Sequence, residues 1–141
     1  MSEEKTPLAS EMYEDLKKVS RDGRSSHFFG SIVSQVVPDG SKIEFHIIDG
    51  QQSLTTVTLL LLAICNMVRT SRVKSNEEAL DDQIMERFVI AKWAKGDDRI
   101  KLRPVKNDRS ALEKLVAGDP DEYEPASNMT INYCFFCDQI L

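Results

Sequence analysis

Residues 45–56 have the sequence Phe-His-Ile-Ile-Asp-Gly-Gln-Gln-Ser-Leu-Thr-Thr. The stretch opens with an apolar segment of the kind found in buried strands. It closes at the start of a helix that is apolar nearly all round, from Ser53 to Val68. Polar residues and a glycine between the two segments break the strand pattern. The sequence therefore predicts a strand–turn–helix unit over Ile43–Met67, with its helix buried at the centre of the fold.

The turn of this unit, Asp49-Gly50-Gln51-Gln52, carries the groups that a phosphate site needs. Gly50 permits a tight turn and close approach of a ligand to the backbone. The free N–H groups of the first helical turn and the helix dipole attract anions. A carboxylate can hold a divalent cation that bridges phosphates, and glutamine amides can orient water. We therefore expect a site for Mg²⁺ with a nucleoside triphosphate.

Each residue of the turn has an expected role in that site. The metal ligand is Asp49, and the catalytic residues are Asp49, Gln51 and Gln52. The residues that cradle the phosphates are Gly50, Gln51, Gln52 and Ser53. A structural role stays open, because Asp before a helix is a common N-cap and Gly after a strand is a common turn residue. On spacing alone, that structural interpretation is the commoner one.

The segments before the unit predict a β-hairpin and a short helix. Residues 27–37 are rich in Phe, Ile and Val, residues 38–41 are Pro-Asp-Gly-Ser, and Lys42–Ile48 forms a second strand. Residues 11–20 place Met12, Leu16 and Val19 on one helical face. Residues 1–10 are expected to be a disordered leader.

The segments after the unit predict three more helices and one short strand. A long helix is expected over residues 76–95, capped by Asn76, and a strand over Arg99–Val105. A helix from Asn107 or Asp108 to Val116 should end at Gly118 and Pro120, and a last helix should cover residues 128–141. The expected fold is α+β: a small mixed sheet with a hairpin, a buried central helix and several flanking helices.

Charge limits the partners of this 141-residue chain. Its net charge of −5 argues against tight, sequence-independent binding of DNA by the whole surface. A local basic face remains, because strand alternation puts Arg99, Lys101 and Arg103 on one side and Ile100 and Leu102 inward. That face is a candidate nucleic-acid surface, although a solvated strand face is the commoner explanation.

Single residues with chemical potential have simpler explanations. Cys134 and Cys137 form a C-x-x-C pair without a second ligand pair, which favours packing over zinc binding. His27 and His46 are expected to be structural or exposed to solvent, and Trp93 to lie in the core or at an interface. Leu54–Val68 is apolar for 15 residues only, short of the roughly 20 that span a membrane. With no signal peptide and an odd cysteine count, we expect a cytoplasmic protein without membrane contact.

The turn motif also resembles a known family signature. Asp49-Gly50-Gln51-Gln52, followed by Leu-Thr-Thr, is similar to the D-G-Q-Q-R-L-T-T motif of the GmrSD restriction endonuclease N-terminal domain. The segments His27–Val33, Arg99–Pro104 and Asn132–Phe136 resemble its other conserved elements, so the likeness covers residues 11–141. It implies a ParB/sulfiredoxin-like fold that binds and hydrolyses nucleoside triphosphates with metal. In such type IV-like systems, this reaction controls cleavage of modified phage DNA.

Two departures from that family lead to a competing hypothesis. Ser53 stands where the motif has arginine, and residues 1–10 lack the family's Pro-x-Tyr-Gln-Arg segment and nearby tryptophan. Serine cannot supply the forked positive charge that suits phosphate. The domain is therefore expected to be incomplete at both ends. The alternative is an inactive remnant that acts through protein contacts or weak DNA contacts.

The resemblance also implies partners. Cleavage in this family belongs to a His-Asn-His nuclease, and neither His27 nor His46 lies in such a pattern. We therefore expect a nuclease domain or subunit outside this chain, DNA bound through the complete assembly, and a homodimer formed at an exposed sheet edge. In a complete domain, the chain would be an NTPase module without a nuclease site.

Overall fold

The computed structural model describes residues 7–23, 33–40, 42–49, 51–94, 96, 99–104 and 106–140. Helix α1 (Pro7–Asp22) precedes the strands β1 (Val33–Asp39) and β2 (Lys42–Asp49), and the long helix α2 (Gln51–Arg69) follows. Next come α3 (Leu80–Ile84), the π-helical turn η1 (Met85–Val89), α4 (Lys106–Ala117), the 3₁₀ turn η3 (Pro120–Glu122) and α5 (Asn128–Ile140). The α+β class is confirmed.

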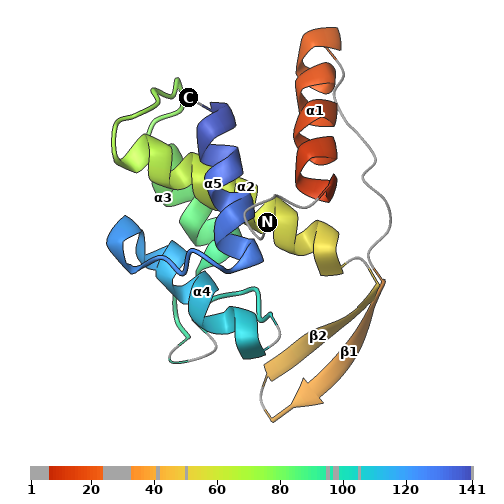
Figure 1. Cartoon of the computed structure of the whole chain (residues 1–141). Helices are drawn as coiled ribbons and strands as arrows, with labels where there is room; N and C mark the ends of the chain where they lie inside the picture. The colour runs from red at the N-terminus through yellow and green to blue at the C-terminus, as the bar shows by residue number, and fades with distance from the viewer. Residues whose placement is uncertain are drawn as a thin grey trace.

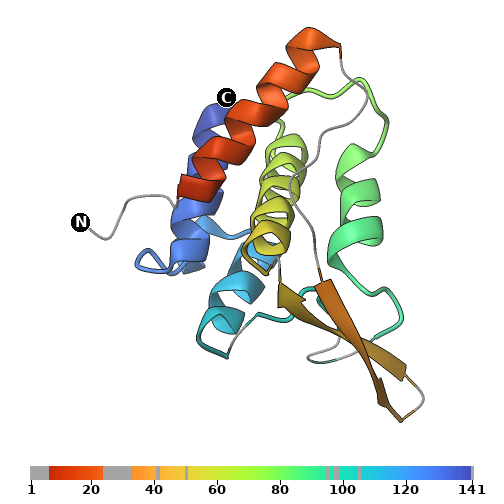
Figure 2. The same ribbon diagram turned by 90° about the vertical axis from the view of Figure 1, so that its right-hand side faces the viewer.

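Helix α2 is the centre of the hydrophobic core, as its apolar sequence predicts. Leu59, Leu62, Ala63 and Cys65 are at most 1% exposed and share one broad face of the helix. Helices α1, α3, α4 and α5 surround it (Figures 1 and 2). The buried side chains of these helices form one cluster with α2. The helix begins at Gln51, two residues before the predicted start.

A buried polar network joins three helices inside this core. The Asn66 side-chain amide on α2 donates to the Leu115 carbonyl on α4 (3.3 Å) and to the Tyr133 hydroxyl on α5 (2.8 Å). Tyr123 adds a second hydroxyl, which donates to that of Tyr133 over 3.4 Å. Gly118 ends α4 at φ +82°, with the Asn66 side chain 3.6 Å from where a Cβ would stand. The network ties α2, α4 and α5 in one arrangement.

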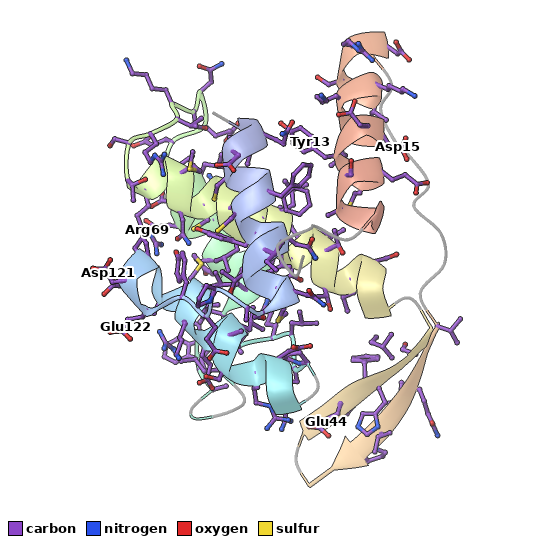
Figure 3. All side chains as sticks on the ribbon, viewed as in Figure 1. Tyr13, Asp15, Glu44, Arg69, Asp121 and Glu122 are labelled. Atoms are coloured by element: carbon purple, nitrogen blue, oxygen red, sulfur yellow. The ribbon has the colours of Figure 1, made fainter. Side chains whose placement is uncertain are left out.

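Helix α1 starts four residues earlier than predicted, at Pro7. Proline suits the first position of a helix, and Ala9 is fully buried, so the leader prediction is wrong for residues 7–10. Residues 1–6 lie outside the described part of the chain. Tyr13 points from α1 toward α5 (Figure 3), where its ring packs against Phe135 and Phe136 and its hydroxyl donates to the Gln139 carbonyl.

The predicted hairpin is confirmed over β1 and β2, which pair antiparallel with Val36 opposite Phe45. Its turn uses Gly40 at φ +63°, a conformation that glycine adopts without strain. Among the described residues the sheet has two antiparallel strands, so the expected mixed sheet is not found in this part of the chain. Predicted strand residues 27–32 lie outside the described residues. The hairpin projects from the helical body (Figure 1).

The predicted helix over residues 76–95 is wrong at both ends. The Ser75 hydroxyl accepts the Glu77 N–H (3.0 Å), which forms a local turn in place of an Asn76 cap, and the helix begins only at Leu80. At the other end, the helical geometry stops after Val89: Ile90 is extended (φ −108°, ψ +129°), and the Val89 carbonyl accepts the Lys101 N–H (2.8 Å). The predicted strand over residues 99–105 is reduced to a single antiparallel bridge between Ile90 and Ile100.

Candidate functional site

The predicted nucleotide site lies at the junction between β2 and α2. Asp49 is the last residue of the strand and Gln51 is the first residue of the helix, so the strand–turn–helix prediction is confirmed for the backbone. In Figures 1 and 2, the first turn of α2 lies next to the end of the hairpin that is opposite its turn. Gly50 and the side chains of Asp49, Gln51 and Gln52 lie outside the described residues.

The next residues of α2 show how the helix is anchored behind that junction. Ser53 is half-buried, and its hydroxyl makes no hydrogen bond to another described residue. Thr56 and Thr58 are buried, and the Thr58 hydroxyl donates to the Leu54 carbonyl one turn back (2.9 Å). Both threonine side chains are therefore shielded from solvent, and the Thr58 hydroxyl has a hydrogen-bond partner. The start of α2 is held by packing on its core side.

The described residues contain no group of three or more His, Cys, Asp or Glu side chains that could hold a metal ion. The side chains of Asp49, Gln51 and Gln52 lie outside those residues, so the Mg²⁺ site expected there stays a prediction.

The three predicted basic residues have the predicted orientation, but two of them have protein partners. Arg99, Lys101 and Arg103 are exposed, while Ile100 and Leu102 pack against the core. Lys101 donates to the Arg87 carbonyl (2.7 Å) at the end of η1. Arg103 pairs with Glu44 of β2 at 2.6 Å, which ties the hairpin to this segment (Figure 3 marks Glu44). Arg99 has no ion pair with another described residue.

Cys137 and His46 agree with the simpler explanations, whereas Cys134 is exposed and does not show the predicted packing. Desolvation by neighbouring atoms raises the pKa of the Cys137 and Cys134 thiols. Both thiols are therefore protonated near neutral pH. His46 is exposed, with its Nε2 3.4 Å from the Glu44 carboxylate. His27 lies outside the described residues.

Three aromatic side chains of the described residues are more exposed than their apolar character predicts. Trp93 is 90% exposed, so of its two predicted places the core is wrong, and an interface stays a prediction. Phe88 is 52% exposed and Phe45 is 64% exposed. The sequence did hold a signal for Trp93: it stands among lysines and arginines, in a stretch without the helical apolar pattern.

No helix in the described ranges has the length and apolar character to cross a membrane. A family model described as "GmrSD restriction endonuclease, N-terminal domain" matches residues 4–139, nearly the whole chain. No curated protein and no solved structure matches significantly.

Proposed function

The chain belongs to the family of GmrSD restriction endonuclease N-terminal domains, and we propose that it is the nucleotide-binding regulatory domain of a modification-dependent, type IV-like restriction system. The family places the chain in restriction and defence against phage. The observation that carries the proposal is the position of the Asp49-Gly50-Gln51-Gln52 motif at a strand-to-helix junction.

The backbone geometry supports a phosphate site at that junction. Helix α2 has 19 residues and begins at Gln51, so the positive end of its dipole lies at the motif. The first N–H groups of a helix have no partner within the helix and suit phosphate oxygens. In this proposal the amides of Gly50, Gln51, Gln52 and Ser53 bind the phosphates.

The side chains of the motif would complete the site. Asp49 would hold Mg²⁺ jointly with the phosphates, and the Gln51 and Gln52 amides would orient the attacking water. Mg²⁺, when bound, supplies neutralisation of the phosphate charge. The chain would be located in the cytoplasm and would itself have a ParB/sulfiredoxin-like fold. A nuclease domain or subunit outside it would cut DNA held by the complete assembly, which we expect to contain two copies of the chain.

A thermal-shift measurement tests this function. A triphosphate present with Mg²⁺ at about 100 times its Kd stabilises the folded state by about 2.7 kcal/mol, which raises the Tm of a domain of this size by several degrees. We expect GTP, UTP or ATP to produce this shift and Asp49→Asn to abolish it. Asp121→Asn, on the exposed turn η3, is the matched control and keeps the shift. If no triphosphate at millimolar concentration moves the wild-type Tm, the proposal is refuted.

Ser53 favours a second candidate, the inactive remnant that acts through protein contacts or weak DNA contacts. The wild-type chain would then bind triphosphate without hydrolysing it, because the arginine charge of the family motif is missing. The variant Ser53→Arg separates the two candidates in the same assay, extended to release of inorganic phosphate. Hydrolysis by the wild-type chain refutes the remnant, and hydrolysis gained by Ser53→Arg identifies that charge as the missing group. No hydrolysis by either protein supports the remnant.

A further inference from the structure

A basic loop that carries an exposed tryptophan lies between η1 and α4. We define the basic segment as residues 87–103. It contains six Lys or Arg residues and two Asp residues, a net charge of +4, so the rest of the chain carries −9. We propose that this segment binds single-stranded nucleic acid, with a base stacked on Trp93 and phosphates held by Arg87, Lys92 and Arg99.

The charge of the segment is available to a ligand. The side chains of Arg87, Lys92 and Arg99 are exposed, and none of them has an ion pair with another described residue. Lys101 and Arg103 differ, because Lys101 donates to the Arg87 carbonyl and Arg103 pairs with Glu44. Three cations therefore remain for contact with an anion. The −9 charge elsewhere repels a polyanion and confines its contact to this segment.

The loop around Trp93 is held in place by backbone hydrogen bonds. The Ala91 N–H donates to the Arg99 carbonyl (2.7 Å), which joins the two ends of the loop, and the Ala94 N–H donates to the Ala91 carbonyl (3.0 Å). Ile90 and Ile100 form the bridge below, and both pack against the core. Trp93 thus lies between two residues, Ala91 and Ala94, whose backbone N–H groups are hydrogen-bonded within the described residues.

The indole itself is suited to stacking. Tryptophan is highly buried in most folded proteins, whereas Trp93 is 90% exposed. The Lys92 ammonium lies over the ring, 5.7 Å from its centroid, which places a positive charge on one face of the indole. Phe88 adds a second exposed ring, 52% accessible, at the start of the segment. Aromatic rings that alternate with cations are the pattern of surfaces that bind unpaired nucleic acid.

This pattern selects the class of ligand. The bases of a duplex are stacked on one another and offer no free face to an indole, so the ligand must contain unpaired bases. An acidic protein would match the charge but does not need a flat, open ring next to the cations. Three cations without an ion pair to another described residue predict a modest affinity with a strong dependence on salt.

The chain contains a single tryptophan, so its fluorescence reports directly on Trp93. A thymidine oligonucleotide of roughly 12 nucleotides, titrated into the wild-type chain, should quench this fluorescence. A labelled copy of the oligonucleotide should show a rise in anisotropy over the same concentrations. Three phosphate contacts give a salt slope of about −2, so raising the salt from about 50 to about 200 mM should weaken binding roughly 20-fold.

Three variants locate the binding surface. Trp93→Ala should weaken binding by at least about 10-fold through loss of stacking, and Arg99→Ala should weaken it and reduce the salt slope by about 0.7. The matched control is Arg72→Ala, an exposed cation in the loop after α2, which should leave binding unchanged. Trp93 and Arg99 are exposed, and an unchanged unfolding transition for each variant verifies that the fold is intact.

Several outcomes overturn the proposal. The first is no quenching and no anisotropy change at low salt. The second is an equal loss from Arg72→Ala and Arg99→Ala, which would show unspecific attraction. The third is duplex DNA binding as tightly as the single strand. The fourth is a tryptophan signal that changes with protein concentration alone, which would assign the exposed ring to self-association.

Discussion

Asn66 makes two buried side-chain hydrogen bonds between helices. Its side-chain amide connects two other helices, through the Leu115 carbonyl and the Tyr133 hydroxyl, at a site where it is only 7% exposed. In the sequence, Asn66 is only one polar residue within the apolar stretch Leu54–Val68. Its partners lie 49 and 67 residues away in the chain, so no local pattern could reveal them.

We expect Asn66→Ala to lower the free energy of unfolding by about 1–3 kcal/mol, because buried polar groups on α4 and α5 lose a donor. The measurement is urea unfolding followed by circular dichroism. Asn76→Ala is the matched control, because Asn76 is exposed and does not cap a helix; we expect a change within about 0.5 kcal/mol. Equal effects of the two substitutions would contradict the network.

Individual site residues could be predicted from the sequence only as far as their backbone positions. Asp49 and Gln51 follow a strong local signal, a strand that ends in a polar turn before an apolar helix, and the structure has that turn. The lysines and arginines around Trp93 are a sequence signal for its exposure, but the extent of that exposure depends on the pairing of Ile90 with Ile100 and on the loop that follows from this pairing.

At the scale of elements, local signals predicted α2, the hairpin, α4 and α5 well. The apolar run of α2, the Pro-Asp-Gly turn of the hairpin and Gly118 after α4 each act within a few residues. The helix predicted over residues 76–95 failed because nonlocal contacts decide its ends. Arg69 of α2 pairs with Asp81 (3.3 Å) at the start of α3, and Val89 pairs with the 99–101 segment.

The start of α3 offers a stability prediction of its own. Ala79 precedes the helix with φ +55° and ψ +36°, a left-handed conformation that costs a residue with a Cβ about 1–2 kcal/mol. Because glycine adopts this conformation without that cost but loses more entropy on folding, we expect Ala79→Gly to raise the free energy of unfolding by about 0.5–1 kcal/mol. The same substitution at Ala117, the last residue of α4, should give no gain. A loss of stability in Ala79→Gly would argue against the left-handed start.

At the scale of the whole molecule, several tyrosine hydroxyls and cysteine thiols stay protonated to a higher pH in the folded state than in the unfolded chain. Burial raises the pKa of the Tyr133 and Tyr123 hydroxyls above the ordinary value of 10.0. Burial also raises the pKa of the Cys65, Cys134 and Cys137 thiols above 9.0. In each case the folded state favours the neutral form, so the unfolded chain loses its protons first as the pH rises.

The resulting stability is complete below the unfolded pKa values and decreases as the pH rises through and above them. We therefore expect the free energy of unfolding in urea to be lower at about pH 10 than at about pH 8, under reducing conditions. Tyr133→Phe removes one of these groups and should make the decrease with pH less steep, even though it also lowers stability at neutral pH. A constant stability over this range, or a slope that Tyr133→Phe leaves unchanged, would contradict the account.

The unbroken helix α2 has a mechanical consequence. Its 19 residues make a rod about 28 Å long, which begins at the proposed triphosphate turn and passes through the middle of the protein interior. A ligand that displaces the first turn of α2 must displace the rest of the helix with it, because closely packed core side chains contact the helix along its length. Ligand binding at the β2–α2 turn and the packing of the core around α2 should therefore change together.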